Sequence, residues 1–312
     1  MAKPIRFGVQ TPPQNTTFAE MRDTWKLIDQ LGYDTAWTFD HFFPILSDPS
    51  GPCFEGWVSL TALMAATSHV KAGILVTGNT YRNPAVLASM GKTLDHASDG
   101  RLIMGIGAGW FEQEHTAYDV PFYTVGERIR RLDEACEIIK RLWTEKQVNF
   151  DGRYYHIKDA YCEPKPVQKP HPPVMIGGGG EKLTLRVVAK HADIWNTFGP
   201  PQVFRDKLSV LRAHCKAVGR NFDEIEVSWA GSAAITQSRE QKEAVVQAIS
   251  KAFGRSPEDV EPGLLIGSAE EIRDGIAKLI EAGVTHFILI ASAPFNHDML
   301  RQFAKDVIPH FK

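Results

Sequence analysis

Three short stretches of this 312-residue sequence carry residue types that can do chemistry, and the clearest is a run of four glycines. The run consists of Gly177, Gly178, Gly179 and Gly180. It lies between an apolar segment and a stretch with helical spacing, so its backbone N–H groups and the positive end of the helix dipole can hold a phosphate. Because only Lys182 and Arg186 follow nearby and the Lys-Ser/Thr of a P-loop is absent, we expect a phosphate mono- or diester and no nucleotide hydrolysis. A flexible turn is the alternative, although four glycines lose more entropy on folding than a turn requires.

The second stretch is an acid–base pair, Asp40-His41, set between two phenylalanines. A carboxylate beside an imidazole can fix one tautomer of the ring and let it donate or accept a proton near neutral pH. In the alternative interpretation, Asp40 caps a loop and His41 is only packed.

The third stretch, residues 105–110, alternates three glycines with other residues and resembles a dinucleotide-binding loop. That interpretation fails because such a loop follows the first strand of a βαβ unit near the start of a domain. We expect instead that Gly107 and its neighbours let a flat ring approach the backbone, with Trp110 as one wall of a pocket. An ordinary glycine-rich turn between a strand and a helix is the alternative.

Alternating strands and helices must position these stretches. Apolar runs predict eight strands at residues 5–9, 35–39, 72–77, 101–106, 174–176, 193–197, 226–230 and 286–290. Apolar residues three or four positions apart predict helices at residues 18–28, 57–67, 84–98, 129–143, 182–190, 202–218, 239–253, 269–282 and 298–307. Eight strands in series favour an α/β fold with a single (β/α)8 TIM barrel over residues 1–312. All three stretches follow strands, as the working residues of such barrels do. Residues 144–173 form an insertion with an expected hairpin at Asp151-Gly152.

Composition excludes several classes of protein. The formal net charge is −2, which argues against a nucleic-acid or membrane-surface partner. No apolar run is long enough to span a membrane, and residues 1–6 lack the apolar segment of a secretory signal. The four cysteines form no CxxC pair, and the histidines have no metal-binding spacing, so we expect no metal, no disulfide framework and a cytoplasmic location.

The sequence as a whole resembles the luciferase-like monooxygenase family, in particular its coenzyme F420-dependent oxidoreductases. The matching segments are residues 7–10, 40–42, 56–57, 75–78, 81–84, 100–102, 107–110, 176–179, 266–268 and 282–284. Each segment is common by itself, but together, in this order and spacing, they are specific and cover nearly the whole chain. The resemblance implies a barrel, a flavin-type cofactor and a homodimer.

The resemblance also implies roles for individual residues. Asp40 and His41 would be the catalytic pair beside the reactive part of a tricyclic ring, with His41 held by Asp40. A non-prolyl cis peptide near Leu75 and Val76 would support the other face of the ring, and Thr77 would hydrogen-bond its polar edge. The four glycines would bind the cofactor phosphate through their N–H groups.

Two departures from the family pattern leave the substrate and the proton donor open. In the sugar-phosphate dehydrogenase branch a catalytic Glu follows the GxGxG-like loop, where this chain has Trp110, so the proton donor is His41, Glu112 or Glu55. The basic residues with which that branch binds the substrate phosphate have no match here, which argues against a sugar phosphate. The loop of residues 42–54 is largely apolar and indicates a hydrophobic or aromatic small-molecule substrate, unless it packs on the insertion or on a second subunit.

The cofactor and activity also have alternatives. An FMN-dependent monooxygenase that uses reduced flavin and oxygen is the nearest, and a binding protein that holds the ring without turnover is weaker. A metal-dependent hydrolase on the same barrel is the weakest, because the histidines are scattered.

Overall fold

Eight parallel strands close a barrel in a computed structural model, which describes residues 3–312; the first two residues of the segment 1–6 lie outside it. Neighbouring strands pair in the order β1-β2-β3-β5-β8-β9-β10-β12, and β12 pairs with β1 to complete the ring. The barrel strands are β1 (Arg6–Gln10), β2 (Thr35–Thr38), β3 (Lys71–Ile74), β5 (Leu102–Gly107), β8 (Val174–Gly177), β9 (Ile194–Thr197), β10 (Glu226–Ile235) and β12 (His286–Ile290). The expected (β/α)8 barrel is therefore confirmed.

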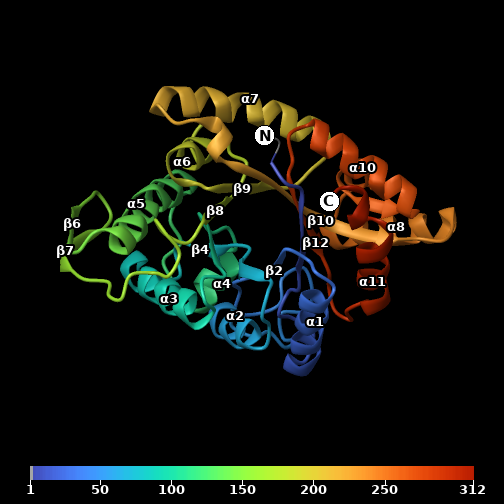
Figure 1. Cartoon of the computed structure of the whole chain (residues 1–312), viewed down its shortest axis with the longest axis horizontal. Helices are drawn as coiled ribbons and strands as arrows, with labels where there is room; N and C mark the ends of the chain where they lie inside the picture. The colour runs from blue at the N-terminus through green and yellow to red at the C-terminus, as the bar shows by residue number, and fades with distance from the viewer. Residues whose placement is uncertain (1–2) are drawn as a thin grey trace.

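Helices surround this barrel on the outside (Figure 1). They are α1 (Phe18–Gln30), α2 (Gly56–Ala65), α3 (Pro84–Ala97), α4 (Glu112–Ala117), α5 (Val125–Thr144), α6 (Thr184–His191), α7 (Pro201–Val218), α8 (Arg239–Phe253), α9 (Pro257–Val260), α10 (Ala269–Glu281) and α11 (His297–Asp306), with short 3₁₀ turns η1 (Phe222–Glu224), η2 (Glu261–Gly263) and η3 (Ile308–His310). Local sequence sets the helix starts. A capping box between Thr17 and Glu20 opens α1, and Asn83 caps α3 before Pro84, whose fixed φ suits a first turn.

The apolar core has an inner and an outer part. The inner cluster fills the barrel and consists of Trp37, Leu75, Ile103, Met175, Ile194, Ala230 and Ile288. The outer cluster lies between strands and helices and includes Trp25, Trp143 and Phe204, all of them fully buried. Because strands of this kind are buried on both faces, they appear in the sequence as continuous apolar runs.

The third and seventh barrel strands differ from their predicted forms. The expected strand at residues 72–77 is interrupted: β3 ends at Ile74, the Leu75–Val76 peptide is cis, and a short β4 (Thr77–Gly78) follows. Strand β10 continues to Ile235 and pairs there with β11 (Leu265–Gly267), a three-residue strand that the sequence pattern did not reveal. The helix α4 was also missed.

The insertion carries the expected hairpin, formed by β6 (Val148–Asp151) and β7 (His156–Ala160). The hairpin turn is fixed to α5, where the Glu134 carboxylate accepts hydrogen bonds from three successive backbone N–H groups, those of residues 153–155. Loop 42–54 instead packs near the start of the chain: the Asn15 N–H donates to the Pro52 carbonyl, and Gln14 pairs with Ile45. Among the described residues, no hydrogen bond joins this loop to the insertion, so the alternative in which it packs there has no support from hydrogen bonding.

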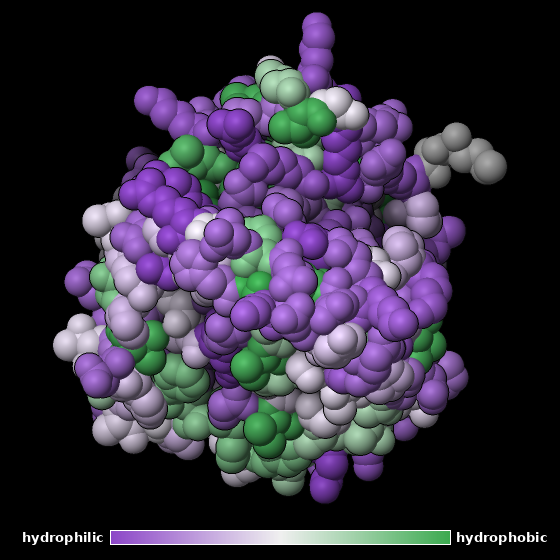
Figure 2. Space-filling model, turned by 90° about the vertical axis from the view of Figure 1, so that its left-hand side faces the viewer, coloured by the Kyte–Doolittle hydropathy of each residue, from purple (hydrophilic) through white to green (hydrophobic). Residues whose placement is uncertain are grey.

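Figure 2 shows the side of the molecule on which α5 and the hairpin lie, and this face is mostly polar with separate apolar patches. Among residues 3–312, no helix is both long enough and apolar enough to cross a membrane. The same residues contain no group of three or more His, Cys, Asp or Glu side chains arranged to hold a metal ion.

Candidate active site

The three stretches singled out in the sequence meet at one end of the barrel. Asp40-His41 follow β2, residues 108–110 follow β5, and the glycine run begins at the last residue of β8. Because all barrel strands run parallel, the segments that follow them lie on the same face, where barrel enzymes place their working residues.

The backbone bulge between β3 and β4 joins two of these stretches. Val76 points its side chain between Gly107 and Gly177: a Cβ added to Gly107 would lie 2.7 Å from Val76 Cγ2, and one added to Gly177 would lie 3.0 Å from it. On the inner side of the bulge, Gln10 Nε2 donates to the Leu75 carbonyl at 3.1 Å. The sequence therefore needs glycine at both positions for these three strand ends to approach one another.

Glycine is needed at position 105 for a different reason, because a Cβ there would lie 1.8 Å from the Ile74 carbonyl oxygen. It is required by the contact between β3 and β5, and the expectation that this glycine serves the pocket does not apply to it.

The glycine run leaves backbone donors free. Gly178 has φ +127°, a value that favours glycine; its N–H donates to the Asn196 carbonyl at 3.0 Å, and its carbonyl accepts from Trp195 Nε1 at 2.8 Å. Among the described residues, no acceptor is bonded to the N–H groups of Gly179 and Gly180. A turn of residues 181–183 separates the run from α6, so the glycines do not directly begin the helix as expected. Adjacent free N–H groups of this kind can bind an anion.

A basic residue that the sequence analysis missed lies beside this run. Lys207, from α7, donates through Nζ to the Gly179 carbonyl at 2.7 Å and pairs with the Glu181 carboxylate at 3.3 Å. Thr197, the last residue of β9, is equally close, since a Cβ on Gly179 would lie 3.2 Å from its hydroxyl oxygen. The anion site thus has a cation and a hydroxyl beside its backbone donors.

His41 is held by Glu114 and not by Asp40. His41 Nδ1 lies 2.8 Å from Glu114 Oε2, and the Glu114 side chain is completely buried. The other ring nitrogen, Nε2, has no hydrogen-bond partner among the described residues and is not fully buried. The expected contact between Asp40 and His41 is therefore wrong, although one nitrogen of His41 is left without a hydrogen-bond partner among the described residues.

Asp40 is instead buried in an ion pair. Both of its carboxylate oxygens accept from Arg82, at 2.5 and 3.1 Å, and Oδ2 also accepts from the Thr77 hydroxyl at 2.6 Å. Burial raises the pKa of Asp40, and Arg82 opposes this rise. Arg82 also pairs with Glu55 at 2.5 Å and so connects the loop after β2 with the start of α2.

The Thr77 hydroxyl is fully used inside the protein. It donates to Asp40 and accepts from Trp57 Nε1 at 2.7 Å, and Thr77 is 0% exposed. In this arrangement the hydroxyl does not face the open site, so the expected hydrogen bond to a ring edge is not supported.

Three aromatic rings surround the His41 imidazole. The rings of Phe39, Phe111 and Trp110 meet it edge-on, at centroid distances of 4.9, 5.7 and 5.8 Å. Trp110 is 58% exposed, a large apolar surface to leave in solvent unless a ligand covers it. Phe43 and Tyr118 extend the cluster behind Phe111.

Comparison with known proteins identifies the family of this chain. The sequence profile of the luciferase-like monooxygenase family matches residues 2–262. This chain belongs to that family. A curated relative, the F420-dependent glucose-6-phosphate dehydrogenase of Kineococcus radiotolerans, is 29% identical over 98% of this chain and 97% of its own length.

Solved structures of other oxidoreductases share the fold. The coenzyme F420-dependent tetrahydromethanopterin reductase of Methanopyrus kandleri superposes with a TM-score of 0.84 at 21% identity, over 99% of this chain and 100% of the reductase. A monooxygenase from Streptomyces bottropensis reaches 0.80 at 21% identity, with coverage of 99% and 100%. At these identities the likeness establishes the barrel architecture alone.

Glu55 and Glu112 are the other two proton-donor candidates of this luciferase-like barrel, and their surroundings differ from those of His41. Glu55 caps α2 and pairs with Arg82, so its carboxylate is already engaged. Glu112 is exposed in the first turn of α4. Of the three candidates, His41 alone combines a buried partner with a ring nitrogen that has no hydrogen-bond partner among the described residues and can exchange a proton.

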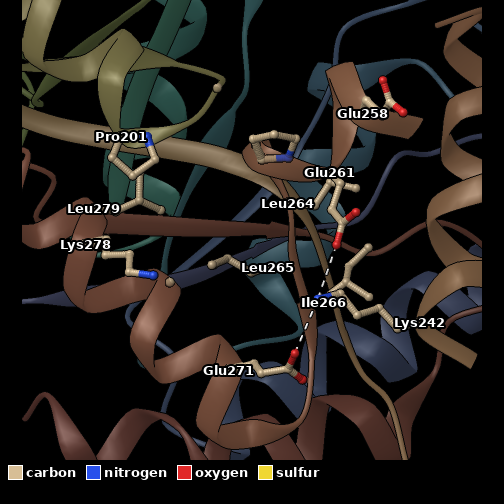
Figure 3. A pocket seen from close by; sticks show the side chains of 14 residues that line it. Pro201, Lys242, Glu258, Glu261, Leu264, Leu265, Ile266, Glu271, Lys278 and Leu279 are labelled. Carbon is tan, nitrogen blue, oxygen red and sulfur yellow. Dashed lines mark hydrogen bonds and ion pairs between the residues drawn. The ribbon is translucent and has the colours of Figure 1, made fainter. Parts of the chain in front are cut away.

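A separate hollow of about 400 Å³ lies between η2, β11 and α10 (Figure 3). In it, Lys242 pairs with Glu261 at 3.2 Å and with Glu271 at 3.3 Å. The hollow contains none of the residues predicted for the site, and these charges are satisfied by one another. Through these ion pairs Lys242 connects α8 with η2 and α10.

Proposed function

We propose that this chain is an oxidoreductase that transfers a hydride between coenzyme F420 and a small organic substrate at the mouth of the barrel. The observation that carries the proposal is the placement of Val76 between Gly107 and Gly177, on the same barrel face as the accessible Nε2 of His41. The relative from Kineococcus, aligned over nearly its whole length, supports the choice of cofactor by its name.

The residues present fit a phosphorylated tricyclic cofactor. Val76 is half-buried, and the two glycines packed against it add no side chain that would keep a flat ring away from the backbone. The free N–H groups of Gly179 and Gly180, with Lys207 beside them, match a phosphate in charge and donor type. In this arrangement Leu75, Val76, Gly107 and Trp110 would border the ring, and the glycine run would hold the phosphate.

The protein's own contribution is binding, orientation and proton transfer. When bound, a deazaflavin supplies the two-electron chemistry of hydride transfer. His41 Nε2 would give or take the proton that accompanies the hydride. The aromatic rings around His41 would exclude water from the reacting atoms. Asp40 takes no direct part, since its carboxylate is buried against Arg82.

Titration of the cofactor-free protein with F420 and with FMN tests the proposal. F420 should bind with a change in its visible spectrum, and a substrate should then bleach it or restore it without oxygen uptake. The alternative is an FMN-dependent monooxygenase, for which the name of the family is the supporting observation. Preferential binding of FMN, with oxygen consumed in turnover, would establish that alternative instead. Binding of F420 without turnover on any substrate would favour a storage or sensing protein.

We propose further that the substrate is apolar or aromatic. The rings of Trp110 and Phe111 contact His41, and Leu46 in the loop before α2 is 57% exposed. The sequence offers no match to the basic residues that bind a sugar phosphate in the dehydrogenase branch. A panel of aliphatic and aromatic alcohols should therefore support F420 reduction, whereas glucose 6-phosphate should not.

Replacing Gly179 with valine should weaken F420 binding by roughly ten- to a hundredfold, the worth of one charge-assisted hydrogen bond. The reason is steric, because even a Cβ would lie 3.1 Å from Lys207 Cε and 3.2 Å from Thr197 Oγ1. Fluorescence titration measures the effect. The same deazaflavin without its phosphate should bind both proteins equally, and Gly126→Val, on the surface of α5, serves as control. Equal loss for both ligands would mean that the run does not hold the phosphate.

We also propose that the chain forms a homodimer through the outer faces of α2 and α3, which pack side by side. Val58 on α2 is 73% exposed and Val86 on α3 is 55% exposed, and the other exposed positions of α2 are Thr61, Ala62 and Ala65. This uncharged surface is typical of an interface. The cytoplasmic location expected from the sequence stays a prediction.

Light scattering should give about twice the chain mass of 34.8 kDa. A Val58→Glu/Val86→Glu double variant should return the mass to that of one chain, because it places four like charges across a two-fold interface. Val218→Glu, on α7, is the control and should leave the mass unchanged. A parent protein that elutes as a monomer would remove this part of the proposal.

A further inference from the structure

Glu114 is the buried carboxylate of the site for which the sequence offered no role. It lies on α4, on the loop that follows β5, and its residue is 0% exposed. Burial alone would raise its pKa, but the hydrogen bonds from His41, the Phe42 N–H and Tyr81 outweigh this, and the pKa of Glu114 lies below its usual value. The carboxylate is therefore ionised at neutral pH.

Every lone-pair position of this carboxylate faces a donor. Oε1 accepts from the backbone N–H groups of Phe42 and Phe43, and Oε2 accepts from the Tyr81 hydroxyl at 2.5 Å and faces His41 Nδ1 at 2.8 Å. An ionised carboxylate only accepts hydrogen bonds. His41 Nδ1 must therefore carry a hydrogen, because an unprotonated Nδ1 would set two acceptors against each other inside the protein.

We propose that Glu114 is a positioning residue that locks His41 in its Nδ1–H tautomer, leaving Nε2 as the atom that exchanges protons with substrate. In the neutral ring Nε2 then carries the lone pair and accepts a proton. When the ring is protonated, Nε2 carries that proton and Glu114 balances the positive charge on the ring. One ring thus takes up a proton in one direction of the reaction and returns it in the other.

Two features make Glu114 the determinant of the tautomer. The backbone N–H groups of residues 42 and 43 fix the loop that bears His41 to α4 through Oε1, so the Glu114 carboxylate keeps its place beside the ring. Turning the ring would break its contact between Nδ1 and Oε2. Tyr81 supplies a donor to Oε2 but does not touch His41 through any hydrogen bond among the described residues. Burial raises the pKa of Tyr81 and Glu114 raises it further, so the phenol stays protonated and remains a donor.

The test is the tautomer of His41 in the full-length protein, measured by long-range ¹H–¹⁵N correlation of labelled histidine rings. The signal is assigned by its loss in His41→Asn. The parent protein should show the Nδ1–H form at a pH where the ring is neutral. In Glu114→Gln the amide oxygen should stay on the two backbone N–H groups, which turns the amide NH₂ toward His41. The amide would then donate to Nδ1, and the tautomer should switch to Nε2–H.

Two matched variants separate this effect from a general disturbance. Glu112→Gln makes the same change on an exposed position of the same helix and should leave the His41 signal unchanged. Tyr81→Phe removes one donor but keeps the carboxylate, and it should retain the Nδ1–H form. An Nε2–H ring in the parent protein, or an unaltered tautomer in folded Glu114→Gln, would overturn the proposal. If Glu114→Gln does not fold, the tautomer of His41 in the parent protein still tests the proposal, because an Nε2–H ring there would contradict it.

The tautomer of His41 does not depend on the proposed function; only the transfer of its proton to or from a substrate rests on it. The two claims can therefore fail separately. The tautomer is read without cofactor or substrate, so a wrong tautomer counts against Glu114 alone. Failure to bind F420 in the titration counts against the proposed function and leaves the Glu114–His41 pair in place. If both hold, Glu114→Gln should lower turnover by about 100-fold or more, because Nε2 would already carry a hydrogen and could not accept a proton from the substrate. The affinity for F420 should change less than threefold.

Discussion

An Arg82→Ala variant is expected to lose about 3–5 kcal/mol of its free energy of unfolding, the cost of leaving one member of a buried ion pair alone. Asp40 is fully buried and receives both of its charged hydrogen bonds from Arg82. Without the guanidinium, only the Thr77 hydroxyl would still donate to this carboxylate. Urea denaturation of the parent and the variant at neutral pH measures the difference.

The loss should depend on pH in a defined direction. Burial already raises the pKa of Asp40 in the folded protein, and removing Arg82 takes away the group that opposes this rise. The folded variant then binds a proton more tightly than the unfolded chain, so its stability falls as pH rises above the unfolded pKa of about 3.9. The deficit should therefore be smaller at pH 4–5 than at pH 8. A deficit that does not change over this range would show that Asp40 stays ionised without its partner.

Two controls identify the cause. Arg239 is 86% exposed and pairs with Glu243 on the surface of α8, so Arg239→Ala should cost less than about 1 kcal/mol. An Asp40→Asn/Arg82→Met double variant removes both charges and should recover much of the stability lost in Arg82→Ala. Without that recovery, the effect would come from lost packing of the arginine stem.

Replacing His41 with alanine is expected to reduce turnover about 100- to 10,000-fold, the usual contribution of a positioned acid or base. F420 affinity should stay within a few-fold, because the residues proposed to hold the phosphate lie on other strands. F420 reduction by the best alcohol of the substrate panel measures turnover, and fluorescence titration measures affinity. An unchanged rate would remove His41 from the mechanism.

The corresponding control is His69→Ala, since the His69 side chain is 86% exposed and lies before β3, at the other end of the barrel. It should change neither rate nor affinity. Loss of His41 also withdraws a donor from Glu114, so the fold of the variant must be checked by its unfolding curve. Activity is then compared only between folded proteins.

The barrel was predictable because each strand–helix unit has its own local signals. Strands buried on both faces appear as apolar runs, and caps such as Thr17 and Asn83 mark where helices begin. The three-residue strand β11 is too short to produce a pattern. Strand β10 continued beyond its predicted end because its extension pairs with β11, which the sequence did not predict.

The site was predictable in position but not in its contacts. Asp40 and His41 are neighbours in sequence, yet in the irregular segment after β2 their side chains point to different partners. One therefore reaches Arg82 and the other Glu114. Glu114 itself follows Glu112 in a polar stretch that looks solvated, and only the packing of α4 turns it inward. Lys207 is likewise one of several charged residues on α7 until the fold brings it to Gly179.

The segment that includes the short helix α4 both lines the substrate pocket and orients His41, which limits how the pocket can change. The loop that leads into it carries Trp110, which faces the open site, and four residues later the same segment supplies Glu114 to His41. A change of loop length that reshapes the wall for a new compound would also move the carboxylate that orients the imidazole. Evolution or engineering toward other substrates should therefore tolerate variation more readily in residues 44–50, which contain neither His41 nor Glu114.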